Sequence, residues 1–296
     1  MDIRIEGYQN KYLNEVVSCL MRNYAWLAEK GPCETTEWLK PVLEYSWQED
    51  VLMNFPHKYG SVLLDDGSVV GFCGNVYSKR YDENGRPYIF LRPTTWAIDA
   101  EYRIYLFKIL KQQFKVADVI GDFEPRASVE EALVNLYKFQ YCDKTIYKFP
   151  AVPHIFSRLR HEFPTSDDKC FDKILSRELL DNEKYGVKAA VFTADAMNRC
   201  IIFYQLVGKK GRQRIMVLKV ENGRLLAEHA HEIFWALMRH ENVYHKLKCD
   251  SRFFCGEKIN YPIIRCSQSS RLLKVRNKEI VPQLDFLYSD TCMLEG

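Results

Sequence analysis

The chain has 296 residues, enough for one large domain or two ordinary ones, and its 47% hydrophobic content suffices for a packed core. Its formal net charge of +3 is too small to predict a nucleic-acid partner. No apolar run approaches the roughly 20 residues of a membrane span, and the first residues lack the build of a signal peptide. We therefore expect a cytoplasmic protein without a membrane partner.

The chain opens with a strand-like segment at residues 3–6, followed by helical spacing over residues 11–27. Gly31 and Pro32 interrupt this pattern, and Thr36 is a suitable N-cap for a second short helix that extends to Trp47. A strand followed by two helices is therefore the predicted opening of the fold.

A β-hairpin follows, with strands at residues 59–64 and 69–77 joined by Asp65-Asp66-Gly67-Ser68. Residues 88–98 read as the next strand. Pro93 lies within it, and proline removes a donor from the ladder, so we expect a bulge or splay at that position.

Residues 94–111 read as a strand that runs into a helix across a short turn. Residues 94–98 are β-branched and aromatic, which suits a strand. Beyond them, apolar residues share one helical face. These are Tyr102, Leu106, Ile109 and Leu110. A helix N-terminus directs free backbone N–H groups at one point, and such a point attracts phosphate.

A fifth strand is predicted at residues 117–123, then a helix with a capping box at Ser128 and Glu131, then a closing strand at residues 145–149. The second half contains apolar strand-like segments and one long helical stripe. We expect a helix at 170–180, strands at 187–192, 200–207 and 214–220, and a helix at 225–239.

The order of elements in residues 1–150 resembles the GNAT (acyl-CoA N-acyltransferase) superfamily. Three features carry the resemblance: the strand–turn–helix of residues 94–111, the hairpin VLLDDGSVVGFCGNVY, and Leu136-Tyr137-Lys138-Phe139-Gln140-Tyr141. The last is similar to the Leu-Tyr-x-x-x-Gly-Phe that closes GNAT domains. The chain departs from the family at the cofactor turn, where Ile104 and Leu106 replace the two glycines. An ordinary strand–turn–helix of another α/β domain is the alternative interpretation.

The resemblance implies an α/β (α+β) fold with a GNAT-like mixed sheet flanked by helices. It places a GNAT-like acyltransferase domain at residues 1–150 and a connector at 151–186. Residues 187–296 would form a second, degenerate GNAT-like lobe, or an unrelated α+β lobe, because the hairpin, strand and helix recur there in the same order.

By the same resemblance, the protein would be a transferase that moves an acyl group from acetyl-CoA or another acyl-CoA to an amine. The acceptor would be a small molecule or a peptide. The alternative is a non-catalytic GNAT-like protein that has lost the cofactor loop and serves as a binding or interaction module.

The family pattern assigns candidate roles residue by residue. Backbone groups that would hold the thioester carbonyl belong to Trp96, Ala97 and Ile98. The pyrophosphate would lie against Arg103, Ile104, Tyr105 and Leu106. Tyr137 occupies the place of the acid that protonates the departing thiolate, and it is equally well interpreted as a core tyrosine.

Candidate bases lie where strands end, which is where α/β sites gather. They are Asp99, Asp122 and Glu124. Each also suits a cap or loop carboxylate. Arg103 also has an alternative, an ion pair with Asp99 four residues earlier.

The ten cysteines include no Cys-x-x-Cys pair, which is typical of reduced thiols. Cys249 and Cys255 lie near His245 but match no zinc-finger spacing. His229 and His231 lie on different faces of the predicted helix and cannot share a metal as an i, i+4 pair does. The sequence therefore predicts no metal site.

Overall fold

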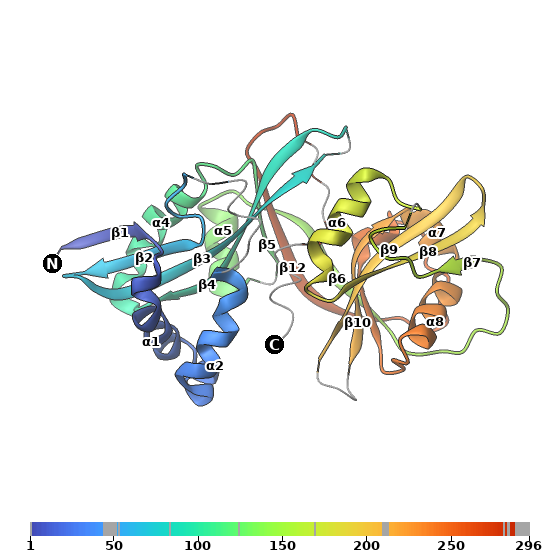
Figure 1. Ribbon diagram of the computed structural model, residues 1–296, viewed down its shortest axis with the longest axis horizontal. Coiled ribbons are helices and arrows are strands. Elements are labelled where there is room, and N and C mark those ends of the chain that lie inside the picture. The colour runs from blue at the N-terminus through green and yellow to red at the C-terminus, as the bar shows by residue number, and fades with distance from the viewer. Residues whose placement is uncertain are drawn as a thin grey trace. The chain divides into compact units, whose positions relative to one another are not determined.

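The computed structural model describes residues 2–43, 52, 54–82, 84–123, 125–168, 170–208, 213–280, 282 and 285–287 (Figure 1). The chain forms two compact units, each assembled from separate segments. Unit 1 comprises Met1–Asp122, Leu133–Gln140 and Leu273–Gln283, and unit 2 comprises Phe123–Ala132, Tyr141–Leu272 and Leu284–Gly296. The predicted division at residues 150 and 187 follows chain order, whereas these units exchange segments.

Unit 1 contains a mixed sheet in the order β1-β2-β3-β4-β5. Its strands are β1 (Ile3–Gly7), β2 (Gly60–Asp65), β3 (Ser68–Tyr81), β4 (Pro87–Ile98) and β5 (Val119–Phe123). Its helical elements are η1 (Asn10–Tyr12), α1 (Leu13–Asn23), α2 (Ala25–Leu43), η2 (Ala100–Tyr105) and α4 (Leu106–Gln113). Helices α1 and α2 pack on one face of this sheet and α4 on the other (Figure 1).

The predicted hairpin is confirmed. β2 and β3 pair antiparallel, with Asp65 opposite Ser68, so the loop is the pair Asp66-Gly67. Both loop residues have positive φ, 46° and 88°, which is the backbone of a type I′ turn. An Asp-Gly pair tolerates that conformation, so a local signal fixes the register of two central strands.

The opening helices differ from their predicted bounds. The first ends at Asn23 because Tyr24 adopts an extended backbone, and the second begins at Ala25. Gly31 kinks the second helix with φ 81° rather than ending the first. The Thr36 hydroxyl donates a hydrogen bond to the Pro32 carbonyl instead of capping a helix N-terminus. Trp47, the predicted end of the second helix, lies outside the described residues.

The fourth strand carries its bulge at Thr95, two residues beyond the predicted Pro93. Pro93 pairs regularly with Asn75, whereas Thr94 and Trp96 face the adjacent residues Gly74 and Cys73. The extra residue, Thr95, has φ 55°. A β-branched residue rarely adopts positive φ, so the bulge is a strained point of the strand.

Unit 2 contains a mixed sheet in which β6, β11, β10, β9, β8 and β7 are successive neighbours. Its strands are β6 (Gln140–Phe149), β7 (Arg160–Glu162), β8 (Val187–Asp195), β9 (Asn198–Val207), β10 (Arg214–Glu221), β11 (Leu247–Asp250) and most of β12 (Arg265–Val275). Its other elements are α6 (Lys173–Glu183), α7 (Gly223–Glu228), α8 (Ala230–His240) and η3 (Ser251–Phe254). Helix α5 (Ala127–Asn135) begins one residue before the predicted cap, Ser128.

The strand order of the first half recurs in the second. Strands β1 to β4 pair antiparallel in sequence, and β4 pairs parallel with β5. Strands β7 to β10 also pair antiparallel in sequence, and β10 pairs parallel with β11. In each half one or two helices follow the first strand and another helical segment precedes the fifth. The repetition of element order inferred from the sequence therefore extends to strand direction.

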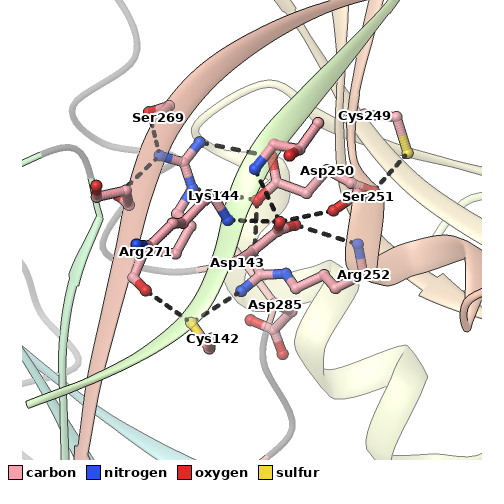
Figure 2. Close-up of polar contacts among 12 residues, drawn as sticks. Cys142, Asp143, Lys144, Cys249, Asp250, Ser251, Arg252, Ser269, Arg271 and Asp285 are labelled. Carbon is pink, nitrogen blue, oxygen red and sulfur yellow. Dashed lines mark hydrogen bonds and ion pairs between the residues drawn. The ribbon is translucent and has the colours of Figure 1, made fainter.

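The strand β6 precedes the connector in the chain yet lies in unit 2, where it pairs antiparallel with β11. A buried network joins β6, β11, η3 and β12 (Figure 2). The Arg271 guanidinium contacts Asp250 at 3.1 Å, and both side chains are 2% exposed or less. Asp143 of β6 accepts hydrogen bonds from the Ser251 hydroxyl and the Arg252 backbone N–H. These contacts hold β6 in its place in unit 2.

Asp250→Asn should lower the free energy of unfolding by about 3–5 kcal/mol, because it leaves the buried Arg271 charge without its counterion. Urea unfolding followed by circular dichroism measures this cost. The matched control is Glu37→Gln, whose exposed pair with Lys40 should contribute about 0–1 kcal/mol. Equal costs for the two variants would contradict the role assigned to the buried pair.

Candidate functional site

The candidate site lies in unit 1 where β4 and β5 part. The two strands pair in parallel through Phe90 and Leu91 of β4, opposite Val119 and Ile120 of β5. Strand β4 continues seven residues beyond Leu91, and the Thr95 bulge lies in that part. A bulged residue is left out of the ladder, so the Thr95 segment can direct backbone groups into the gap between the strands. The predicted splay of these two strands is therefore confirmed.

Asp122 is a half-buried carboxylate near the end of β5. Burial raises the pKa of Asp122 to about 6, against the opposing charge of Arg92 on β4. A carboxylate with this pKa is suited to accept a proton near neutral pH.

Tyr137 lies in a turn just after α5, not within the helix as the family pattern implied. Its ring stacks on Phe107 of α4 with centroids 5.3 Å apart, and Phe114 meets it edge-on at 5.9 Å. The hydroxyl oxygen is buried and has no hydrogen-bond partner among the described residues. Burial raises the pKa of Tyr137, so the phenol stays protonated and can donate. The structure thus brings Tyr137 next to the helix that follows the predicted cofactor turn.

Asp99 differs from Asp122 because both of its carboxylate oxygens are already bonded. The Arg22 guanidinium donates to Oδ2 at 2.7 Å, and the Asn23 amide donates to Oδ1 at 2.8 Å. These contacts tie the end of α1 to the end of β4. Arg22, not Arg103, is the ion-pair partner of Asp99. The geometry favours the structural interpretation of Asp99 over the role of a base.

The contacts of Asp99 have a consequence for η2. Asp99 occupies the N-cap position, but its side chain makes no capping hydrogen bond, because α1 engages it. The first N–H groups of η2, at Ala100 and Glu101, therefore lack a side-chain cap. A hydrogen bond from the Tyr102 hydroxyl to Asp65 holds this helical turn against β2.

The predicted pyrophosphate residues lie within a continuous helical segment rather than at its start. Arg103, Ile104 and Tyr105 belong to η2, and Leu106 begins α4. In a 3₁₀-helix each N–H bonds to the carbonyl three residues back, and the Leu106 N–H donates to the Arg103 carbonyl. The side chain of Arg103 is exposed and has no hydrogen bond or ion pair among the described residues, and Ile104 is 72% exposed.

The three residues predicted to hold a thioester carbonyl, Trp96, Ala97 and Ile98, end β4. The Trp96 carbonyl accepts a hydrogen bond from the Tyr24 hydroxyl at 2.5 Å, and this bond anchors the strand after the bulge. The Ala97 carbonyl accepts from the Cys19 thiol. Ile98 packs into the apolar cluster with Leu63, Cys73 and Ile109.

Two residues remain, a predicted one that the structure does not describe and a site residue that was not predicted. Glu124, the third candidate base, lies outside the described residues. Thr95 was missed, because nothing in the letters Pro93-Thr94-Thr95-Trp96 indicates positive φ. The Thr-Thr pair even favours regular strand, and only the pairing of β4 with β3 reveals the bulge.

Two further thiols and the side chains that could ligate a metal are also candidate reactive groups. Burial raises the pKa values of the Cys19 thiol to about 12 and of the Cys142 thiol, which makes both poor nucleophiles. In the part of the chain that the structure describes, no three His, Cys, Asp or Glu side chains converge as metal ligands. Within the same described ranges, no helix is long and apolar enough to cross a membrane.

Solved structures share this fold over 93% of the chain. A GCN5-related N-acetyltransferase from Anabaena variabilis matches with a TM-score of 0.57 and 10% identity, covering 73% of that chain. A probable N-acyltransferase from Enterococcus faecalis matches with a TM-score of 0.53 and 11% identity, also over 73% of its length. A GCN5-related N-acetyltransferase from Kribbella flavida gives 0.50 and 10%, over 71% of its length.

No protein-family model matches the chain, and no curated protein matches it in sequence. The structural likeness at 10–11% identity concerns the fold. The chain therefore has the fold of the GCN5-related N-acetyltransferases, and the resemblance in its sequence is confirmed at that level. The likeness extends over both halves of the chain.

Asp99→Ala should lower the free energy of unfolding by about 1–2 kcal/mol, because it removes two hydrogen bonds at a partly exposed position. Thermal unfolding followed by circular dichroism measures the loss. The control is Glu29→Ala on the exposed surface of α2, which keeps α1 and β4 joined. If Asp99→Ala left stability unchanged and abolished activity instead, the structural assignment of Asp99 would be wrong.

Proposed function

We propose that the protein is an acyl-CoA-dependent N-acyltransferase that uses acetyl-CoA or another acyl-CoA and acts on an amine of a small molecule or peptide. The observation that carries the proposal is the parting of β4 and β5 beside Asp122. This arrangement combines two parallel strands that stop pairing with a carboxylate able to take a proton near neutral pH. The fold shared with N-acetyltransferases supports the same class of reaction.

The proposed roles belong to Asp122, the bulged segment of β4 and Tyr137. Asp122 accepts a proton from the amine, whose nitrogen then attacks the thioester carbonyl carbon. Backbone N–H groups of the bulged segment from Thr95 to Ile98 stabilise the developing oxyanion. The carbon–sulfur bond breaks, and the Tyr137 hydroxyl, which has no other partner among the described residues, gives its proton to the departing thiolate.

The residues near η2 fit an anionic cofactor in part. The N–H groups of Ala100 and Glu101 are uncapped by the Asp99 side chain, and the exposed Arg103 offers a planar guanidinium fork for phosphate. The N–H groups farther along η2 belong to the part of the helix where N–H groups donate to carbonyls three residues back, as the Leu106 N–H does to Arg103. We therefore place the pyrophosphate at the start of η2, with Arg103 beside it and Ile104, Tyr105 and Leu106 behind it.

One observation favours a second candidate, a non-catalytic binding module. Ile104 replaces the first glycine of the family turn and is 72% exposed, so a branched side chain projects where a phosphate would need close approach to the backbone. In this alternative the fold persists without coenzyme A binding. The two candidates make opposite predictions about acyl-CoA affinity.

Acetyl-CoA at 100 times its dissociation constant should stabilise the protein by roughly 2.7 kcal/mol, because only the folded state binds it. Differential scanning fluorimetry detects the shift, with a longer acyl-CoA as a parallel ligand. Arg103→Ala should weaken binding by about 1.5–3 kcal/mol through loss of a charged hydrogen bond. The control is Lys111→Ala, an exposed cation of α4 that lies farther along the chain than the proposed site. Absence of binding at millimolar ligand by calorimetry would favour the non-catalytic module.

Asp122→Asn should reduce turnover by about 10²–10⁴ and remove the rise of kcat/KM with pH near 6.

The same variant should lower activity but raise the stability of the protein near neutral pH. The folded pKa lies above the ordinary value, so folding favours protonated Asp122, and wild-type stability falls as pH rises from about 4 to about 6. The variant lacks this fall, which should amount to about 1–2 kcal/mol after allowance for partial exposure.

Tyr137→Phe serves as the companion variant, because it removes one hydroxyl and keeps the ring stacked on Phe107. An acid at this position predicts a comparable loss of turnover with nearly unchanged acyl-CoA affinity. If Tyr137 is only structural, the variant should keep full turnover. That result would exclude Tyr137 as the acid but would not bear on Asp122, which its own variant tests.

A further inference from the structure

In unit 2, residues 151–163 form a segment that contacts α8 and that includes strand β7 near its end (Figure 1). We call this segment the strap. Three contacts fix it to its surroundings. Near its start, a ring nitrogen of His231 lies 3.1 Å from the Val152 carbonyl. Near its end, the Phe163 ring stacks on His240 with centroids 3.5 Å apart and planes within 6°. Both histidines belong to α8, so the strap is anchored at both ends of that helix.

The third contact lies between these ends, at Glu232 of α8. Its Oε1 accepts hydrogen bonds from the Ser157 hydroxyl and from the backbone N–H groups of Arg158 and Leu159, at 2.9, 2.6 and 2.7 Å. Burial alone would raise the pKa of Glu232, but these hydrogen bonds lower it overall, so the group remains a carboxylate. The strap therefore engages Oε1 of Glu232, while Oε2 lies 3.6 Å from Nδ1 of His229.

A cavity of about 420 Å³ lies between the strap and α8. This volume falls within the range of small-molecule sites, roughly 300–1,000 Å³. The residues that decide its chemistry are aromatic or cationic. They are His154, His161, Phe163, Trp235, Arg239 and His240.

Two features of the lining define the ligand that would fit. The parallel Phe163–His240 stack and the Trp235 indole offer flat apolar surfaces for a ring. The guanidinium of Arg239 is exposed and has no hydrogen bond or ion pair among the described residues. The Glu232 carboxylate of the same lining directs Oε1 to the strap and Oε2 toward His229, so among the described residues of the lining the Arg239 guanidinium is the cation without a partner, beside aromatic walls.

We propose that the cavity between the strap and α8 binds a small molecule that carries an anionic group on a flat aromatic or heteroaromatic ring. Arg239 receives the anion through its planar fork, and Trp235 with the Phe163–His240 stack contacts the ring. This binding site is separate from the acyltransfer residues of unit 1 and does not depend on the proposed function.

The test is isothermal titration calorimetry of the full chain with two probes, 4-hydroxybenzoate and adenosine 5′-monophosphate, which separate an aromatic carboxylate from a nucleotide. At least one should bind with a dissociation constant below about 1 mM. Inorganic phosphate lacks the ring and adenosine lacks the anion, so each should bind at least tenfold more weakly. Arg239→Gln should weaken the probe at least tenfold, about 1.4 kcal/mol, and Arg239→Lys should weaken it less.

Two matched variants locate the binding. Arg158→Gln changes an exposed arginine of the strap that is not among the lining residues, and it should leave affinity unchanged. Arg103→Ala alters the proposed cofactor site of unit 1 and should also leave it unchanged. The proposal is overturned if neither probe binds at 10 mM to folded protein, if Arg239→Gln binds as tightly as the wild type, or if Arg103→Ala abolishes binding.

Discussion

Unit 2 depends on the neutralisation of one buried carboxylate. Asp250 is 1% exposed at the end of β11, and an isolated charge at such a position is costly. Arg271 of β12 contacts it directly, and Arg252 of η3 lies 3.5 Å away. The Arg252 guanidinium in turn lies over the Phe123 and Phe286 rings, so residues from both ends of the unit's sequence pack around the same charges. Four segments distant in the chain are thus fixed by one electrostatic requirement.

A different constraint organises the candidate site of unit 1. The Thr95 bulge lets β4 keep its ladder with β3 while it leaves β5 after Leu91. Positive φ at a β-branched residue costs free energy, of order 1–3 kcal/mol, and persists only where the surroundings determine it. Here the Tyr24 hydroxyl and the Asp99–Arg22 pair secure the strand on the far side of the bulge. The helices that open the fold therefore help to hold the strand at the opening.

The sequence predicted those features that local chemistry determines. The Asp66-Gly67 turn fixes its hairpin through residues that tolerate positive φ, and runs of apolar residues identify β8 and β9. The break at His229 between α7 and α8 was missed, because the apolar stripe runs on across it. The exchange of β6 into unit 2 was also missed, since no local pattern states which sheet a strand joins.

Site residues show the same limit. Asp99 and Asp122 are indistinguishable in sequence, as both are acids near a strand end. Their difference comes from neighbours far away in the chain, Arg22 and Asn23 for one and burial near Arg92 for the other. Periodicity located both carboxylates at the correct elements, but only tertiary packing separates a structural anchor from a candidate base.

The two halves share a strand order, yet their strand-to-helix junctions differ in a way that bears on function. In unit 2, Asn222 adopts a left-handed backbone and its side chain accepts from the Leu225 N–H, which caps α7 from within. Its amide also donates to Asn198 and the Arg199 carbonyl. In unit 1, Asp99 caps nothing because α1 holds both its oxygens. The equivalent turn of unit 2 is thus closed by its own side chain, whereas the start of η2 keeps N–H groups without a side-chain cap. This difference is the reason that we propose the cofactor site for unit 1 and not for unit 2.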